Sequence, residues 1–198
     1  MRALLYLLLV PVVLLEATVA VLALMPKVSE TYRAFFIDRT TDCWRLDTLG
    51  TYAMGETVSF LPPRSPAQSE LMRCGWLGPQ DTGTWARGPE AELRIAVADP
   101  PADLLLDLEL LPFNTTERPV QTIRVFVNGK GLDTLQLEGT EARHLVIPIP
   151  AEYVELGDER IDVGFGFPSA YSPADVGLNN DQRRLSIRLL SLKLTRAE

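Results

Sequence analysis

The chain has 198 residues, of which 46% are hydrophobic and 23% charged, and its formal net charge is −7 at pH 7. This composition excludes a disordered chain, and the acid excess argues against nucleic-acid binding, which needs clustered Lys and Arg. One His and two Cys exclude a zinc finger and a Cys-rich disulfide scaffold, and we expect no metal and no cofactor. The composition favours a binding or assembly domain.

The N-terminal segment, residues 1–25, is the most apolar part of the chain, and its stretch 3–25 carries only one charge, Glu16. At 1.5 Å per residue this stretch is long enough for a hydrocarbon core of roughly 30 Å. The sequence predicts a single transmembrane helix that serves as a signal anchor. Cleavage as a signal peptide is the alternative, because Ala20 and Ala23 suit a signal peptidase. Glu16 either contacts another transmembrane helix or stays protonated in the span.

Topology signals conflict around this segment. The Lys and Arg residues that follow it favour a cytoplasmic C-terminal domain, whereas the short N-terminal tail and the Cys pair favour a domain outside the cytoplasm. We expect a single-pass protein of the bacterial inner membrane with a periplasmic domain. Its expected partners are the membrane, an integral-membrane protein and a glycan.

The rest of the chain is divided into a juxtamembrane segment, 26–57, and a domain, 58–198. Apolar residues alternate with polar ones in short runs, Asn128-Gly129 between two runs is a specific hairpin signal, and no long amphipathic helix intervenes. This pattern predicts an all-β protein, an antiparallel β-sandwich of the jelly-roll type. The predicted strands lie at 91–99, 104–111, 122–139, 144–150, 159–167 and 183–194.

The sequence has no clear pattern of catalytic residues. The one imidazole, His144, begins an apparent strand and has no Gly-x-Ser-x-Gly elbow nearby. Carboxylates such as Glu90 and Glu92 are plentiful, so their presence alone does not indicate a glycosidase pair. We expect a non-enzymatic protein.

Two cysteines, Cys43 and Cys74, are each followed closely by Trp. Two Cys without a third suit one disulfide, which would tie the juxtamembrane segment to the sandwich. The alternative is a pair of buried free thiols, which a cytoplasmic location would favour.

The segment between Trp76 and Arg87 is the best sequence candidate for a contact surface. Exposed Trp76 and Trp85 would stack on sugar rings, and Gln80, Asp81 and Arg87 would bind sugar hydroxyls or a protein partner. The alternative is that both indoles plug the end of the sandwich.

A second polar cluster precedes the last predicted strand. There Asp181 and Arg183 are close enough in sequence to pair and fix the loop. Local pairing is the expected role of both residues.

Four runs of residues resemble an accessory β-sandwich domain attached to bacterial membrane glycosyltransferases and polysaccharide-export proteins. The resemblance implies a jelly roll of the galactose-binding type with a Gly-Trp-x-x-Pro-Glu-x-x-Gly-x-Trp signature and an Asp-x-Arg before the last strand. It covers roughly residues 35–194, with Gln80 in place of the usual Glu and Leu77 where Ser is common. The runs are FFIDRTTDCW, CGWLGPQDTGTWARGPEAEL, VFVNG and YSPADVGLNNDQRRLSIRLLSLKL, and the matching residues are Gly75, Trp76, Pro79, Gly83, Trp85, Gly88, Asp181 and Arg183.

Together these features predict a membrane-anchored, non-catalytic periplasmic sandwich that binds carbohydrate or assists a polysaccharide-synthesising complex. The alternative is a structural accessory subunit of a large bacterial membrane complex, docked through its transmembrane helix and its sandwich.

Overall fold

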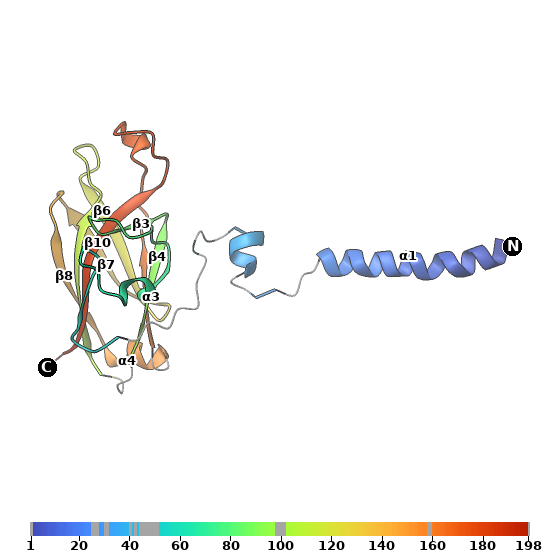
Figure 1. Cartoon of the computed structure of the whole chain (residues 1–198), viewed down its shortest axis with the longest axis horizontal. Helices are drawn as coiled ribbons and strands as arrows, with labels where there is room; N and C mark the ends of the chain where they lie inside the picture. The colour runs from blue at the N-terminus through green and yellow to red at the C-terminus, as the bar shows by residue number, and fades with distance from the viewer. Residues whose placement is uncertain are drawn as a thin grey trace. The chain divides into compact units, whose positions relative to one another are not determined.

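A computed structural model describes residues 2–24, 28–29, 32–39, 41, 43, 52–97, 102–157 and 160–197. The chain divides into two compact units, Met1–Arg39 and Thr40–Glu198. The first unit contains helix α1 (Arg2–Leu24) and one π-helical turn (Arg33–Ile37), both visible in Figure 1.

Helix α1 does not support the predicted location in a membrane. Over the part of the chain that the structure describes, no helix is both long enough and apolar enough to cross a membrane. The prediction of a single-pass inner-membrane protein is therefore wrong. Glu16 lies exposed on this helix, and its role as a contact residue stays a prediction.

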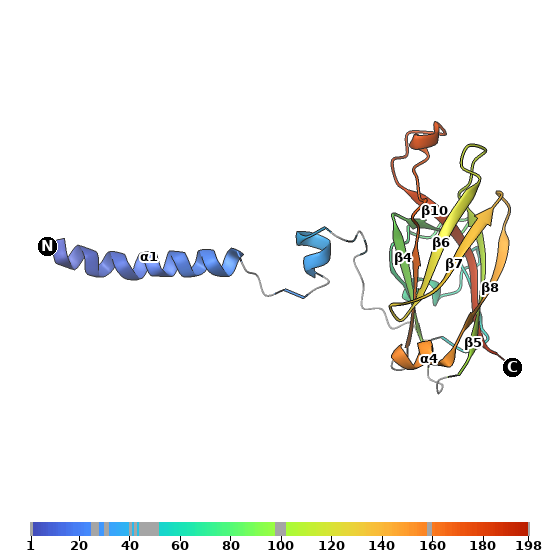
Figure 2. The same cartoon turned by 180° about the vertical axis from the view of Figure 1, so that it is seen from behind.

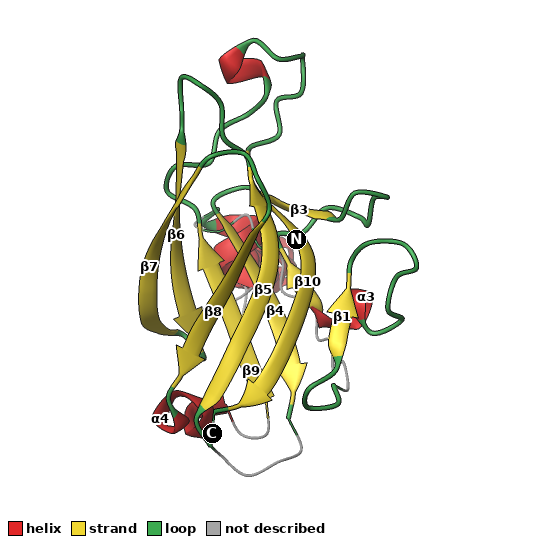
Figure 3. Ribbon diagram, turned by 90° about the vertical axis from the view of Figure 1, so that its left-hand side faces the viewer, coloured by secondary structure: helices red, strands yellow, loops and turns green. Residues whose placement is uncertain are grey.

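The second unit is a β-sandwich. Its described residues form two five-stranded antiparallel sheets, one ordered β1-β10-β5-β8 with β3 also paired to β10, the other ordered β2-β4-β9-β6-β7. Figure 3 shows the two sheets stacked face to face, as in a jelly roll. The elements are β1 (Thr57–Ser59), α3 (Gln68–Leu71), β2 (Met72–Cys74), β3 (Thr84–Arg87), β4 (Glu90–Ala96), β5 (Leu104–Pro112), β6 (Val120–Val127), β7 (Lys130–Glu138), β8 (Arg143–Ile149), α4 (Ala151–Val154), 3-10 turns at Glu155–Gly157 and Ala174–Val176, β9 (Arg160–Gly166) and β10 (Leu185–Arg196).

Period-two burial builds the core between the sheets. In β5 every second residue from Leu104 to Leu110 is buried, and the residues between them face outward. Leu93 of β4 and Val163 of β9 are registered neighbours, and both are fully buried. Burying each such side chain contributes about 1.5–3 kcal/mol, so the interior faces hold the sandwich together.

Two predicted features are confirmed. Strands β6 and β7 join through Asn128 and Gly129, whose φ values of 49° and 80° are those of a tight hairpin turn. The long C-terminal run forms β10, which lies inside its sheet with β5 on one side and β1 and β3 on the other.

The predicted contact segment, 76–87, is partly a strand. Thr84–Arg87 forms β3 and pairs with β10, and Trp76 makes an isolated bridge to Ala86. Glycine at position 75 makes this possible, because its φ is +76° and an added Cβ would lie 2.2 Å from the carbonyl oxygen of Glu90.

Candidate functional site

A groove lies on the outer face of the sheet that contains β4, β9, β6 and β7, the sheet whose strands β4, β6 and β7 are labelled in Figure 2. Its volume is about 370 Å³. Strand alternation places the β9 side chains, because the residues of β9 between the buried ones point outward. The lining residues are Cys43, Arg73, Glu90, Ala91, Glu92, Phe126, Gly129, Asp162, Gly164, Phe165 and Gly166.

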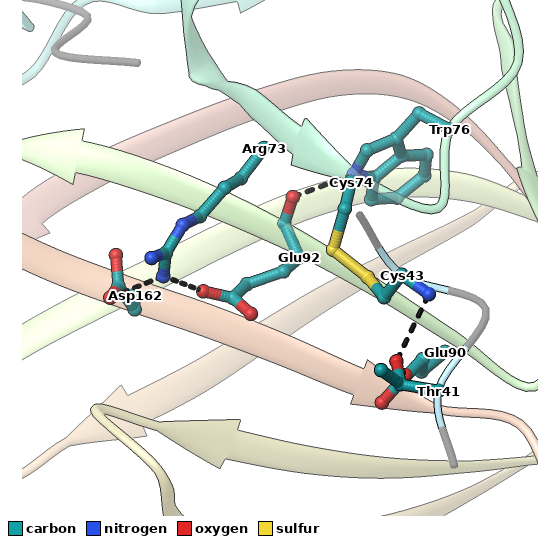
Figure 4. Close-up of a disulfide and its surroundings, with 8 residues drawn as sticks. All are labelled: Thr41, Cys43, Arg73, Cys74, Trp76, Glu90, Glu92 and Asp162. Carbon is teal, nitrogen blue, oxygen red and sulfur yellow. Dashed lines mark hydrogen bonds and ion pairs between the residues drawn. A yellow bond between two sulfur atoms is a disulfide. The ribbon is translucent and has the colours of Figure 1, made fainter. Parts of the chain in front are cut away.

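An irregularity in the short edge strand β2 directs two consecutive residues to this face. Met72 pairs with Leu93 and Cys74 pairs with Glu92, so β2 has one residue more than β4 over the same length. Such a bulge redirects side chains that would otherwise alternate. Consequently Arg73 contacts Glu92 of the neighbouring strand β4 on this face, while Cys74 also lies on this side (Figure 4).

A network of charges holds one wall of the groove. The Arg73 guanidinium contacts the carboxylate of Glu92 and lies 2.9 Å from that of Asp162. Arg94, only 5% exposed, donates two hydrogen bonds to Asp162, at 2.6 and 2.8 Å. Charge-assisted bonds of this kind fix side-chain geometry. The network therefore holds the side chains of this wall together.

The Asp162 carboxylate is suited to binding rather than to acid catalysis. Burial by itself raises the pKa of Asp162, but the Arg94 hydrogen bonds and the charges of Arg73, Arg94 and Arg160 outweigh it, so the pKa lies below its ordinary value. A glycosidase acid needs the opposite shift. Within the described residues, no group of three His, Cys, Asp or Glu is placed to hold a metal ion.

Phe126, on β6, lines the side of the groove that is farthest from β4. It is half-buried, and the neighbouring strands present glycine beside it: Gly164 and Gly166 on β9 and Gly131 on β7. Cβ atoms added at those glycines would lie 3.4–3.9 Å from Phe126. One edge of the ring faces the β9 glycines and the other faces Gly131, so the ring lies across the sheet with glycine on both flanks.

The disulfide brings an early segment of the chain to the groove. Cys43 and Cys74 are bonded with their Cα atoms 5.2 Å apart, which confirms the predicted pair. Thr41 then donates its hydroxyl hydrogen to the Glu90 carboxylate and accepts a hydrogen bond from the Cys43 amide at 3.0 Å (Figure 4). Residues 41 and 43 thus lie over the end of the groove nearest β4.

The sequence-predicted contact residues do not gather at this groove. Trp76 packs against the core, donates its indole N–H to the Glu92 carbonyl oxygen at 3.0 Å and meets Phe165 edge-to-face. Trp85 belongs to the other sheet, where its ring meets Phe113 at 5.8 Å and lies under the Arg188 guanidinium. The two indoles therefore contact different parts of the sandwich.

The polar members of that predicted surface also separate. Gln80 and Asp81 are exposed at a turn, and Asp81 pairs with Arg64 at 3.0 Å. Arg87 is exposed at the end of β3 and lines a hollow together with Asp181.

In the loop before β10, Asp181 and Arg183 form the ion pair expected from sequence, with an N···O distance of 2.6 Å. Hydrogen bonds from the Arg183 side chain and backbone lower the pKa of Asp181 to about 2. The Asp181 carboxylate therefore bridges both parts of Arg183 and fixes the local chain path.

The residues that shape the groove, above all Phe126, Arg73 and Asp162, were not distinguished by sequence reasoning. A signal was present in β9, where Gly164 and Gly166 interrupt an alternating strand. Glycine inside a strand often marks a place where another group approaches the backbone closely.

No family model matches the sequence, and no curated protein matches it. Solved structures do resemble it. A CBM36 carbohydrate-binding module in complex with calcium and xylotriose is 7% identical with a TM-score of 0.39, over 61% of this chain and 87% of that one. The CBM36-1 domain of a xylanase from the hindgut metagenome of Trinervitermes trinervoides is 12% identical with a TM-score of 0.36, over 56% and 76%. A family 35 module from Clostridium thermocellum is 11% identical with a TM-score of 0.32, over 60% and 76%. Similarity at this level does not transfer a ligand to this chain.

Proposed function

We propose that the groove binds a neutral carbohydrate without chemically changing it. The observation that carries the proposal is the half-buried Phe126 ring, left open by glycines on both flanks and facing a wall of fixed charged groups. A sugar ring has an apolar C–H face and a rim of hydroxyls, so it matches an aromatic surface beside rigid donors and acceptors. Sites of this kind combine apolar contact area with a few polar groups that fix orientation.

The charge balance supports a neutral ligand. Three carboxylates, Glu90, Glu92 and Asp162, line the groove against one guanidinium, that of Arg73, and the whole chain is acidic. A polyanion such as a nucleic acid would meet like charge there, and this repulsion opposes its binding. Sugar hydroxyls, which both donate and accept hydrogen bonds, suit the mixed wall.

The test is a panel of soluble neutral glycans, with binding to the full chain measured by calorimetry. Phe126→Ala should weaken binding at least about 30-fold, as expected when a central aromatic contact worth about 2 kcal/mol is lost. Because this ring is half-buried, Phe126→Leu serves as a second variant that keeps apolar volume but has no ring face. Melting temperatures of both variants report on folding.

Trp85→Leu is the matched control and also tests the sequence-predicted surface of Trp76, Gln80, Asp81, Trp85 and Arg87. Loss of binding in Trp85→Leu with none in Phe126→Leu would place the contact surface in the 76–87 segment instead. Failure of every glycan to bind would favour the structural alternative, an accessory subunit that docks on protein.

A further inference from the structure

Phe126 separates two hollows on the same sheet face. Besides the groove of about 370 Å³ toward β4, a second hollow of about 290 Å³ lies toward β7. Both have Phe126 in their lining. The second hollow is lined by Arg124, Val125, Phe126, Gly131, Leu132, Asp133 and Thr134.

The second hollow also offers polar groups beside the ring. Arg124 is exposed on β6, next to Gly166 in register, while Asp133 and Thr134 are exposed on β7. One guanidinium and one carboxylate give this hollow a balanced charge. It therefore has the same combination as the groove, an aromatic ring with a hydroxyl-binding rim.

From the geometry of these hollows we infer that the ligand is an extended glycan chain that crosses the strands, with one sugar unit over Phe126 and others on each side. This inference rests on the proposed function. Crossing from β4 through β9 and β6 to β7 covers three strand spacings, about 14 Å at 4.8 Å each. That length suits a short oligosaccharide and exceeds one sugar ring.

Glycines keep the path across the strands open. At Gly131 a Cβ would meet only Phe126 carbons, at 3.9 Å or more, so a larger side chain there would fill the second hollow without displacing backbone. Gly131→Val is therefore a blocking variant, and a β-branched residue is well tolerated in a strand. Gln136→Val is its matched control, since Gln136 is exposed on the same strand and outside the lining of the hollow.

The experiment measures binding of glucose, xylose, mannose and their β-1,4- or α-1,4-linked oligomers of increasing length to the full chain by calorimetry. We expect at least one series in which the affinity rises about tenfold or more from the monosaccharide to the longest oligomer and then levels off. In Gly131→Val the gain in affinity with oligomer length should shrink. Gln136→Val should behave as the unmodified chain.

Two results would overturn the inference while leaving the proposed function intact: equal affinity for monosaccharide and oligomers, or an unchanged length dependence in Gly131→Val. Absence of binding in every series would overturn both.

Discussion

Removing the disulfide gives the best-defined stability test. In the chain-entropy relation, a bond between residues 31 positions apart, as Cys43 and Cys74 are, restricts the unfolded chain by about 12 cal/mol/K, or about 4 kcal/mol at 25 °C. Most domains have only about 5–15 kcal/mol of stability, so this is a large share. The Cys43→Ser, Cys74→Ser double variant should therefore unfold at markedly lower urea concentration.

Urea denaturation measures both the midpoint and the slope of the free energy of unfolding against urea. The slope should rise in the variant, because an unfolded chain without the bond exposes more surface. Since Cys43 is 1% exposed, a double Ala variant controls for burying the serine hydroxyls. A loss below about 1 kcal/mol in both variants, with an unchanged slope, would refute the reasoning.

Three further predictions follow from single contacts. Gly75→Ala should lower the free energy of unfolding, measured with urea, by more than about 3 kcal/mol, because the positive φ adds strain to a clash with backbone. Gly78→Ala is its control: the space around Gly78 is open, so this change should alter stability by less than about 0.5 kcal/mol. Trp76→Phe removes one hydrogen bond and should cost about 1 kcal/mol by the same assay. Asp162→Asn leaves the Arg94 guanidinium without its carboxylate and should cost about 3 kcal/mol at pH 7. The pKa of Asp162 is lower in the folded state than in the unfolded chain, where it is about 3.9. Its contribution to the free energy of unfolding is therefore present above pH 3.9 and is lost as the pH falls through the folded-state pKa. Below pH 4 the stability of Asp162→Asn should therefore depend less on pH than that of the unmodified chain.

Local pattern was sufficient to predict most of the sandwich, because most of its strands bury one face. The alternation from Leu104 to Leu110 and the turn at Asn128-Gly129 are both local signals, and both are found in the structure. Strand β3, Thr84–Arg87, was missed because four residues beside Gly and Pro are too few to show alternation.

The groove could not be predicted from local patterns of this kind. Arg73 and Asp162 are 89 positions apart, and their contact depends on which strands become neighbours. The spacing of residues along the chain does not indicate the order of the strands in the sheet. The 76–87 segment drew attention because aromatic and polar residues cluster there in sequence, yet folding assigns its two indoles to different sheets.

The position of β10 has a consequence for how the sandwich assembles. Within the described sheets β1 and β3 pair only with β10, and all of its partners precede it in the chain, with Thr57 opposite Lys193. During synthesis, the edges of these strands that pair with β10 stay unpaired until β10 has been made. Pairings between such distant residues are slow to form, typically in milliseconds to seconds, and open edges invite association with other chains. Newly made chains are therefore open to association with other chains until β10 has paired.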